Sequence, residues 1–118
     1  MTAPFLPEEP YAPGLSVIEV DFARSATQGA PFQATRIVVD PGAHSPVDKH
    51  AVTECWLAST GTARMTLGDE ELTLTPGDII AIAPHVPHQV FNESDDDFVF
   101  FSVWWDANKE QAVEAGEG

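Results

Sequence analysis

The chain has 118 residues and a mass of 12.7 kDa, which is enough polypeptide for one domain. Nineteen acidic residues stand against five basic ones, so the formal net charge is −14 at pH 7. Nucleic acids and anionic membrane surfaces both attract clustered Lys and Arg. We therefore expect neither of them as a partner, and we attribute the acidity to solubility and self-repulsion.

Cys55 is the only cysteine, which excludes an intrachain disulfide and a metal cluster built on thiolates. No apolar run approaches the ~20 residues that a membrane-spanning helix needs. The first residues have neither the basic segment nor the apolar segment of a signal peptide. A cytoplasmic location is the resulting expectation.

Short apolar segments alternate with turn signals along the chain. Residues 1–14 carry four prolines and predict an extended arm, residues 15–106 predict a β-domain, and residues 107–118 predict a tail. A loop is expected at residues 25–29. The predicted strands are 15–22, 34–39, 50–59, 64–67, 71–75, 79–83, 89–92 and 98–105. Many short strands at regular spacing predict an all-β fold, either a double-sheet sandwich or a barrel.

Two of these strands are apolar on both faces. Segment 79–83 has no polar face, which predicts a central strand buried on both sides. Segment 98–105 is the most apolar stretch of the chain. One of its faces is expected to meet a second sheet or another subunit, so a homodimer is predicted.

The chemistry-bearing residues are concentrated, because all four histidines lie between residues 44 and 88. On a strand, Asp48, His50 and Glu54 share one face, whereas Lys49 points to the opposite face. Two carboxylates and an imidazole pointing into a small barrel are costly without compensation. A divalent cation would neutralise the acids and accept the imidazole lone pair.

A second segment could complete the shell of such a cation. Between Pro84 and Pro87 the backbone is restrained, which fixes the direction of the side chains that follow. His88 comes directly after this segment. It is therefore the ligand expected to approach from another strand.

These residues resemble the two sequence motifs of the cupin superfamily. The first motif is matched in spacing by Gly42, Asp48, His50, Glu54 and Gly61, and the second by Gly77, Asp78, His88 and Asn92. Three positions depart from the motifs. Asp48 stands where many cupins have a histidine ligand, Ala83 where a proline is common, and His85 where a glycine is common.

The resemblance implies a small single-domain cupin with a jelly-roll β-barrel, and many cupins pair as dimers. It also implies a divalent metal ion held by His50, Glu54, His88 and Asp48, with Asp48 either a direct ligand, a ligand through water or a residue of the barrel rim. A shell of two imidazoles and two carboxylates suits Zn, Fe or Mn, and the sequence does not choose among them.

Three further residues are catalytic candidates. His44 follows a turn, where it is either merely exposed or an acid–base group at the mouth of the site. His85 is expected at the rim or in contact with substrate. Trp56 either packs in the core or stacks on substrate. Cys55, on the opposite face, is expected to be a packed apolar residue.

Three functions remain open at this level. The first is a metal-dependent enzyme of dioxygenase, isomerase or lyase type that acts on a small molecule. The second is a cupin that works with an aminoacyl-tRNA-synthetase-like partner to form N–N bonds in hydrazine natural products, suggested by a resemblance at residues 54–56 and 102–105. The third is a cupin that binds a small molecule without catalysis.

Overall fold

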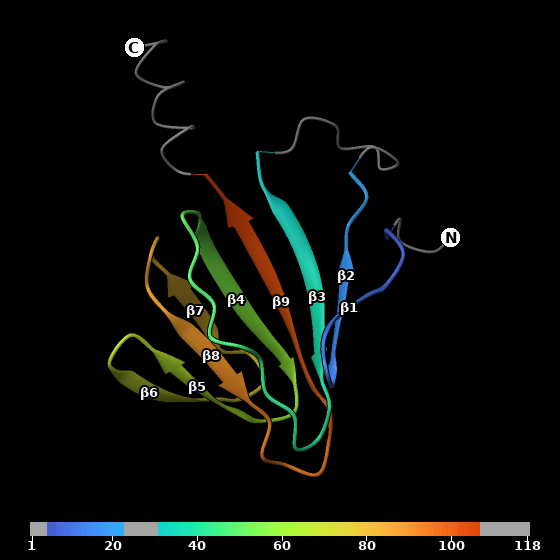
Figure 1. Ribbon diagram of the computed structural model, residues 1–118, viewed down its shortest axis with the longest axis vertical. Helices are drawn as coiled ribbons and strands as arrows, with labels where there is room; N and C mark the ends of the chain where they lie inside the picture. Colours follow the sequence, from blue (N-terminus) through green and yellow to red (C-terminus); the bar gives the residue numbers. More distant parts are fainter. Residues whose placement is uncertain (1–4, 23–30, 107–118) are drawn as a thin grey trace.

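A computed structural model describes residues 5–22 and 31–106 of the chain (Figure 1). These ranges form strands and no helix, as predicted for an all-β fold. The strands are β1 (Glu9–Ala12), β2 (Leu15–Glu19), β3 (Gln33–Val39), β4 (Thr53–Thr60), β5 (Ala63–Leu67), β6 (Glu70–Leu74), β7 (Ile79–Ile82), β8 (His88–Phe91) and β9 (Phe98–Trp105). The predicted loop at 25–29 and the predicted tail at 107–118 lie outside the described residues.

Two antiparallel sheets make up the fold. The large sheet has six strands in the order β1-β2-β3-β9-β4-β7, and the small sheet has three in the order β6-β5-β8. Strand β9 therefore lies between β3 and β4, although it is far from both in sequence. It joins strands β1 to β3 to strands β4 and β7 in one sheet. In Figure 1 the small sheet lies across from the large one, with the chain crossing between them. The predicted double-sheet sandwich is confirmed.

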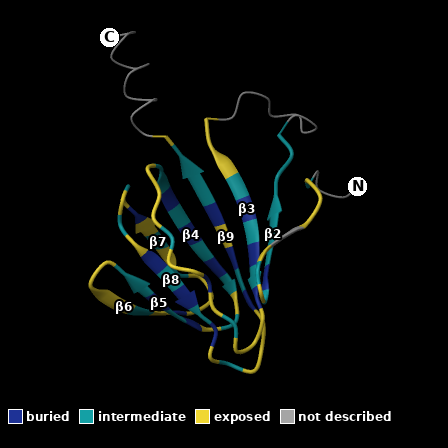
Figure 2. Ribbon diagram, viewed as in Figure 1, coloured by how far each residue is buried: buried dark blue, intermediate teal, exposed yellow. Residues whose placement is uncertain are grey.

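The core fills the space between the two sheets. Burial alternates along β3 and β4, so every second side chain points inward, as expected for strands with one covered face. Val39, Phe98 and Met65 are fully buried there, and they come from both sheets. Each such side chain contributes about 1.5–3 kcal/mol relative to an exposed one. Figure 2 shows these buried positions as dark bands on β3, β4, β8 and β9.

The prediction of a central buried strand at residues 79–83 is wrong. Strand β7 pairs with β4 alone and forms an edge of the large sheet. Its residue Ile82 is buried in the core, but Ile79 is 63% exposed. The strand is therefore apolar on both faces, although its outer face is not covered within the described residues.

Strand β9 has the bounds that the sequence predicts, Phe98–Trp105. Its inner face contributes Phe98 and Phe100 to the core between the two sheets. On its outer face Phe101 is 40% exposed in the monomer. The predicted second sheet thus covers one face, and the outer face is left open within the described residues.

The predicted arm contains a strand of its own. Strand β1 adds to the edge of the large sheet by pairing with β2, and Phe5 forms a further isolated bridge with Val20. The pairing of β1 with β2 is interrupted by a β-bulge between Pro10 and Ala12. In residues 5–22 and 31–106 no helix has the length and apolarity to cross a membrane.

Candidate metal site

Three of the four predicted ligands converge at one end of the sandwich. The ligand atoms of Asp48, His50 and His88 all lie within 4.8 Å of one another. Asp48 and His88 are joined by a β-bridge in which each backbone N–H donates to the other residue's carbonyl at 2.9 Å. The carbonyl of His50 accepts a hydrogen bond of 2.6 Å from the backbone N–H of His85. Backbone contacts between distant segments therefore bring these side chains together.

This convergence does not arise in the way that strand alternation predicted. Strand β4 begins at Thr53, so Asp48 and His50 lie in the loop before it. Lys49, predicted to face the other side, lines the same cavity as its two neighbours. The loop has no alternating faces, and its bridge to His88 places the residues instead.

Glu54 is the inward-facing residue of β4 nearest to this cluster. Its Oε2 accepts hydrogen bonds from Trp56 Nε1 at 2.7 Å and from Ser102 Oγ at 2.5 Å. Its Oε1 is buried without a hydrogen-bond partner and lies 3.4 Å from Nε2 of His88. Burial alone would raise the pKa of Glu54, but the adjacent His88 imidazole and the hydrogen bonds from Ser102 and Trp56 outweigh it and lower that pKa.

The imidazole of His88 is held in one orientation. It is 2% exposed, and its Nδ1–H donates to the carbonyl of Val86 at 3.0 Å. In the neutral ring this leaves the lone pair on Nε2, directed at the cluster. Burial lowers the pKa of His88, whereas the neighbouring Glu54 carboxylate and the Val86 carbonyl raise it by more.

The residues present fit a divalent metal ion. Glu54 Oε1 is a buried anionic oxygen without a hydrogen-bond donor, which is costly unless a cation or a proton compensates it. His88 offers Nε2 beside it, and Asp48 and His50 offer a carboxylate and an imidazole within reach of His88. Two nitrogen and two oxygen donors suit Zn, Fe or Mn. The assignment of these four residues as ligands stays a prediction.

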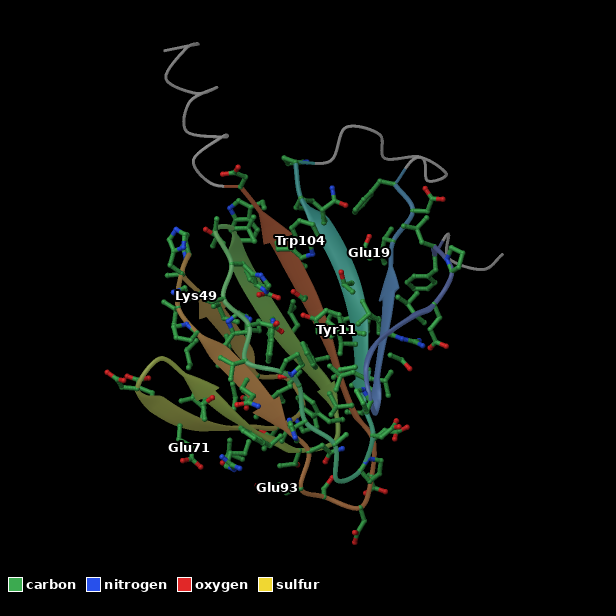
Figure 3. All side chains as sticks on the ribbon, viewed as in Figure 1. Tyr11, Glu19, Lys49, Glu71, Glu93 and Trp104 are labelled. Carbon is green, nitrogen blue, oxygen red and sulfur yellow. The ribbon has the colours of Figure 1, made fainter. Side chains whose placement is uncertain are left out.

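A cavity of about 580 Å³ opens onto the cluster. All four predicted ligands line its wall, together with apolar side chains from the inner face of the large sheet. Figure 3 labels three more of its lining residues, which come from three strands of the large sheet: Tyr11 on β1, Glu19 on β2 and Trp104 on β9. The cavity therefore gives a bound molecule access to the predicted ligands.

The three catalytic candidates occupy different surroundings. Trp56 is buried, lines the cavity, and stacks on Phe100 with ring centroids 4.2 Å apart, so it packs in the core and also borders the site. His44 and His85 are exposed and are not among the residues that line this cavity. His85 has a left-handed backbone with φ of 68°, which accounts for glycine being common at this position.

Two residues of the site were not predicted from the sequence. Ser102 supports Glu54 from β9, where it is the register partner of Trp56. Tyr11 donates a hydrogen bond of 2.8 Å from its hydroxyl to Oδ1 of Asp48. The sequence signal that could have indicated Ser102 is its position as a polar residue in an otherwise apolar strand. Tyr11 is the only tyrosine of the chain, but nothing in its local sequence connects it to Asp48.

Comparison with known proteins identifies the family. The family model described as a cupin domain matches residues 35–104. The structure of a cupin 2 conserved barrel domain protein from Salinispora arenicola CNS-205 superposes with a TM-score of 0.71 and 33% identity, covering 80% of this chain and 77% of that one. The plu4264 protein from Photorhabdus luminescens superposes with a TM-score of 0.68 and 26% identity, covering 86% of each chain.

A curated relative is the xanthan biosynthesis protein XanB of Xanthomonas campestris pv. campestris strain B100, which is 39% identical over 69 residues. That match covers 58% of this chain but 15% of the relative, so this chain spans a small part of it. The family match and the Salinispora structure agree with the fold described above. The chain belongs to the cupin domain family.

Proposed function

We propose that the chain is a metal-dependent enzyme that holds a divalent ion through Asp48, His50, Glu54 and His88 and acts on a small molecule in the adjoining cavity. One observation carries this proposal. All four donors line a cavity of about 580 Å³, which is within the usual size of small-molecule sites. Substrate and metal would share that space, as a metal-dependent reaction requires.

The surrounding residues prepare the donors for an ion. Trp56 and Ser102 donate to Oε2 of Glu54, which keeps this carboxylate ionised and leaves Oε1 free. The Val86 carbonyl fixes the ring of His88 with Nε2 toward the cluster. When bound, a divalent ion supplies Lewis-acid catalysis, or oxygen chemistry where it is iron. Dioxygenase, isomerase and lyase reactions are all compatible with such a centre.

The substrate is proposed as a small polar molecule. The cavity wall combines apolar side chains with the carboxylate of Glu19, the hydroxyl of Thr35 and the ammonium of Lys49. These groups can accept and donate hydrogen bonds to a ligand with several polar substituents. Because one relative is named for xanthan biosynthesis, hydroxyl-rich compounds belong among the first compounds to be tested.

The first experiment is elemental analysis of untagged protein purified without chelator. We expect close to one equivalent of Zn, Fe or Mn per chain, with loss of the metal in His50→Ala and His88→Ala. His44→Ala is the matched control, because His44 is exposed and lies outside the cavity lining. Iron would direct the search to oxygen-consuming reactions, and zinc or manganese to Lewis-acid reactions.

Catalysis is tested by comparing the metal-loaded and chelated protein against hydroxyl-rich and amino-bearing compounds. Turnover by the loaded protein alone supports the enzyme. Protein that contains no metal and takes none up on reconstitution would contradict the proposal and favour a binding module. Metal without turnover, combined with binding of a compound in the cavity, would favour the non-catalytic cupin.

A further inference from the structure

Tyr11 reaches the site from an unexpected part of the chain. It lies on the short edge strand β1, at the point where the pairing with β2 is irregular: Pro10 pairs with Ser16 and Ala12 with Leu15. Tyr11 is therefore the extra residue of a β-bulge. Bulges redirect a side chain that regular pairing would place elsewhere, and they are common beside functional sites.

The redirected side chain contacts a predicted metal ligand. The Tyr11 hydroxyl donates to Oδ1 of Asp48 at 2.8 Å, across 37 positions of sequence. Tyr11 is 50% exposed and lines the cavity, so its ring lies at the boundary between the cavity and solvent. The contact thus lies at the mouth of the site.

Two of the other predicted ligands also have side chains that are held by neighbouring groups. Glu54 is held by Trp56 and Ser102, and the ring of His88 is held by the Val86 carbonyl. For His50 the structure shows a restraint on the backbone, a hydrogen bond from the His85 N–H to its carbonyl. Asp48 lies in a loop, where a free carboxylate would rotate about χ1 and χ2. Its hydrogen bond with Tyr11 supplies the corresponding restraint.

We propose that Tyr11 is a positioning residue, which orients the Asp48 carboxylate for metal binding and connects the N-terminal strand to the metal centre. This inference rests on the proposed metal site. The phenol occupies one carboxylate oxygen and leaves the other for an ion. Hydrogen-bond partners of this kind typically raise metal affinity by 10–100-fold.

The test is a double-mutant cycle with Co²⁺, whose visible spectrum reports the coordination geometry. Tyr11→Phe keeps the ring and removes only the hydroxyl. We expect it to weaken Co²⁺ binding by about 10-fold and to change the visible spectrum of the loaded protein. In an Asp48→Ala background, where the acceptor of the Tyr11 hydroxyl is removed, the same substitution is expected to have no further effect, because Tyr11 acts through Asp48.

Ser102→Ala provides the matched control, because Ser102 supports Glu54 and not Asp48. It is expected to weaken Co²⁺ binding by a similar factor in both backgrounds. Circular dichroism establishes that each variant is folded before it is titrated. A purely structural role for Tyr11 would lower the unfolding midpoint while leaving the affinity and the spectrum unchanged, and that result would overturn the inference.

A second overturning result is an equal loss of affinity on Tyr11→Phe with and without Asp48. Such a loss would mean that the hydroxyl acts through something other than this carboxylate. If the wild-type protein takes up no Co²⁺, the proposed metal site itself fails, and the inference fails with it. If the wild type binds Co²⁺ and Tyr11→Phe binds it identically, only the role of Tyr11 is rejected.

Discussion

Trp56 and Glu54 lie two residues apart on the inner face of β4, and the indole Nε1–H donates to Glu54 Oε2 at 2.7 Å. Ser102, the register partner of Trp56 on β9, donates to the same oxygen. The strand pairing that builds the core thus also places both donors at this carboxylate. Oε1 is left free on the side of His88. This arrangement determines how substitutions near the site should behave.

Trp56→Phe should weaken metal binding while keeping the aromatic packing against Phe100. The variant loses one hydrogen bond to a charged acceptor, which costs about 1.5–3 kcal/mol of unfolding free energy. We expect metal affinity to fall by about 10-fold, measured by competition with a chromophoric chelator. Phe100→Leu is the control, because it disturbs the same ring contact without touching Glu54. Equal metal affinity in the wild type and Trp56→Phe would contradict this account.

The two predicted histidine ligands should differ in what their removal does to the apoprotein. His50 is exposed, so His50→Ala is expected to change the free energy of unfolding by less than about 0.5 kcal/mol. His88 is 2% exposed and pairs with Glu54, so His88→Ala should cost about 1–3 kcal/mol. Urea titrations in the presence of chelator measure both values.

The same two variants should respond alike when metal is added. Each loses a predicted ligand, so the rise in melting temperature that metal gives the wild type should disappear in both. His44→Ala should keep the full rise. A metal-dependent stabilisation that persists in His50→Ala would remove His50 from the ligand set.

Tyr11 should titrate well above its ordinary range in the folded apoprotein. Burial, the hydrogen bond to Asp48 and the charges of Asp48 and Glu54 raise its pKa from 10.0 to about 12. Between these values the unfolded chain has lost the proton and the folded chain retains it, so stability falls as pH rises through this window. Tyrosinate absorbance measures the midpoint directly, because the chain has one tyrosine.

Two controls accompany this titration. In urea the midpoint should return to about 10, the value of a free tyrosine. Asp48→Asn should lower the midpoint in the folded protein, because it removes the nearest negative charge. Circular dichroism at each pH separates titration from alkaline unfolding. A folded wild type that titrates with a midpoint near 10 would be inconsistent with the contact.

The two glycines of the first motif should differ in their tolerance of a side chain. Both have a left-handed backbone, with φ of 79° at Gly42 and 82° at Gly61. At Gly42 a Cβ would meet nothing within 4 Å, so Gly42→Ala should cost about 1–2 kcal/mol from backbone strain alone. At Gly61 a Cβ would collide with the carbonyl oxygen of Asp97, so Gly61→Ala should cost about 2–5 kcal/mol. Chemical unfolding measures both, and equal costs would argue against the close approach.

The predicted homodimer has a specific surface to test. On the outer face of the large sheet, Phe101 is 40% exposed and Ile79 is 63% exposed. Covering such apolar side chains with a second copy would remove them from water. Light scattering should then give twice the chain mass for the wild type and the chain mass for Phe101→Glu. A monomeric wild type would reject the dimer without affecting the site.

Much of the fold follows from local patterns in the sequence. Alternation and turn residues predict every described strand except β1, and the uninterrupted apolar run predicts β9 with its observed bounds. The same reasoning fails for β7, because an apolar strand at an exposed edge has the same composition as one at the centre of a sheet. Composition shows what a strand is made of, and only the pairing order shows what covers it.

The site was predictable to the extent that its residues belong to motifs. The spacing of His50, Glu54 and His88 indicates a metal site, but alternation misplaces Lys49, which is in the loop before β4. The bulge that directs Tyr11 to Asp48 depends on the register between β1 and β2, which no local pattern encodes. Contacts of this kind require the three-dimensional structure.

Two of the predicted ligands lie on different sheets, Glu54 on the large sheet and His88 on the small one. An ion held by both would crosslink the halves of the sandwich, so the sheets could not separate without releasing it. Until the halves have docked, the chain lacks a complete set of donors. Metal uptake should therefore be a late event in folding, and the ion should slow unfolding far more than it speeds folding.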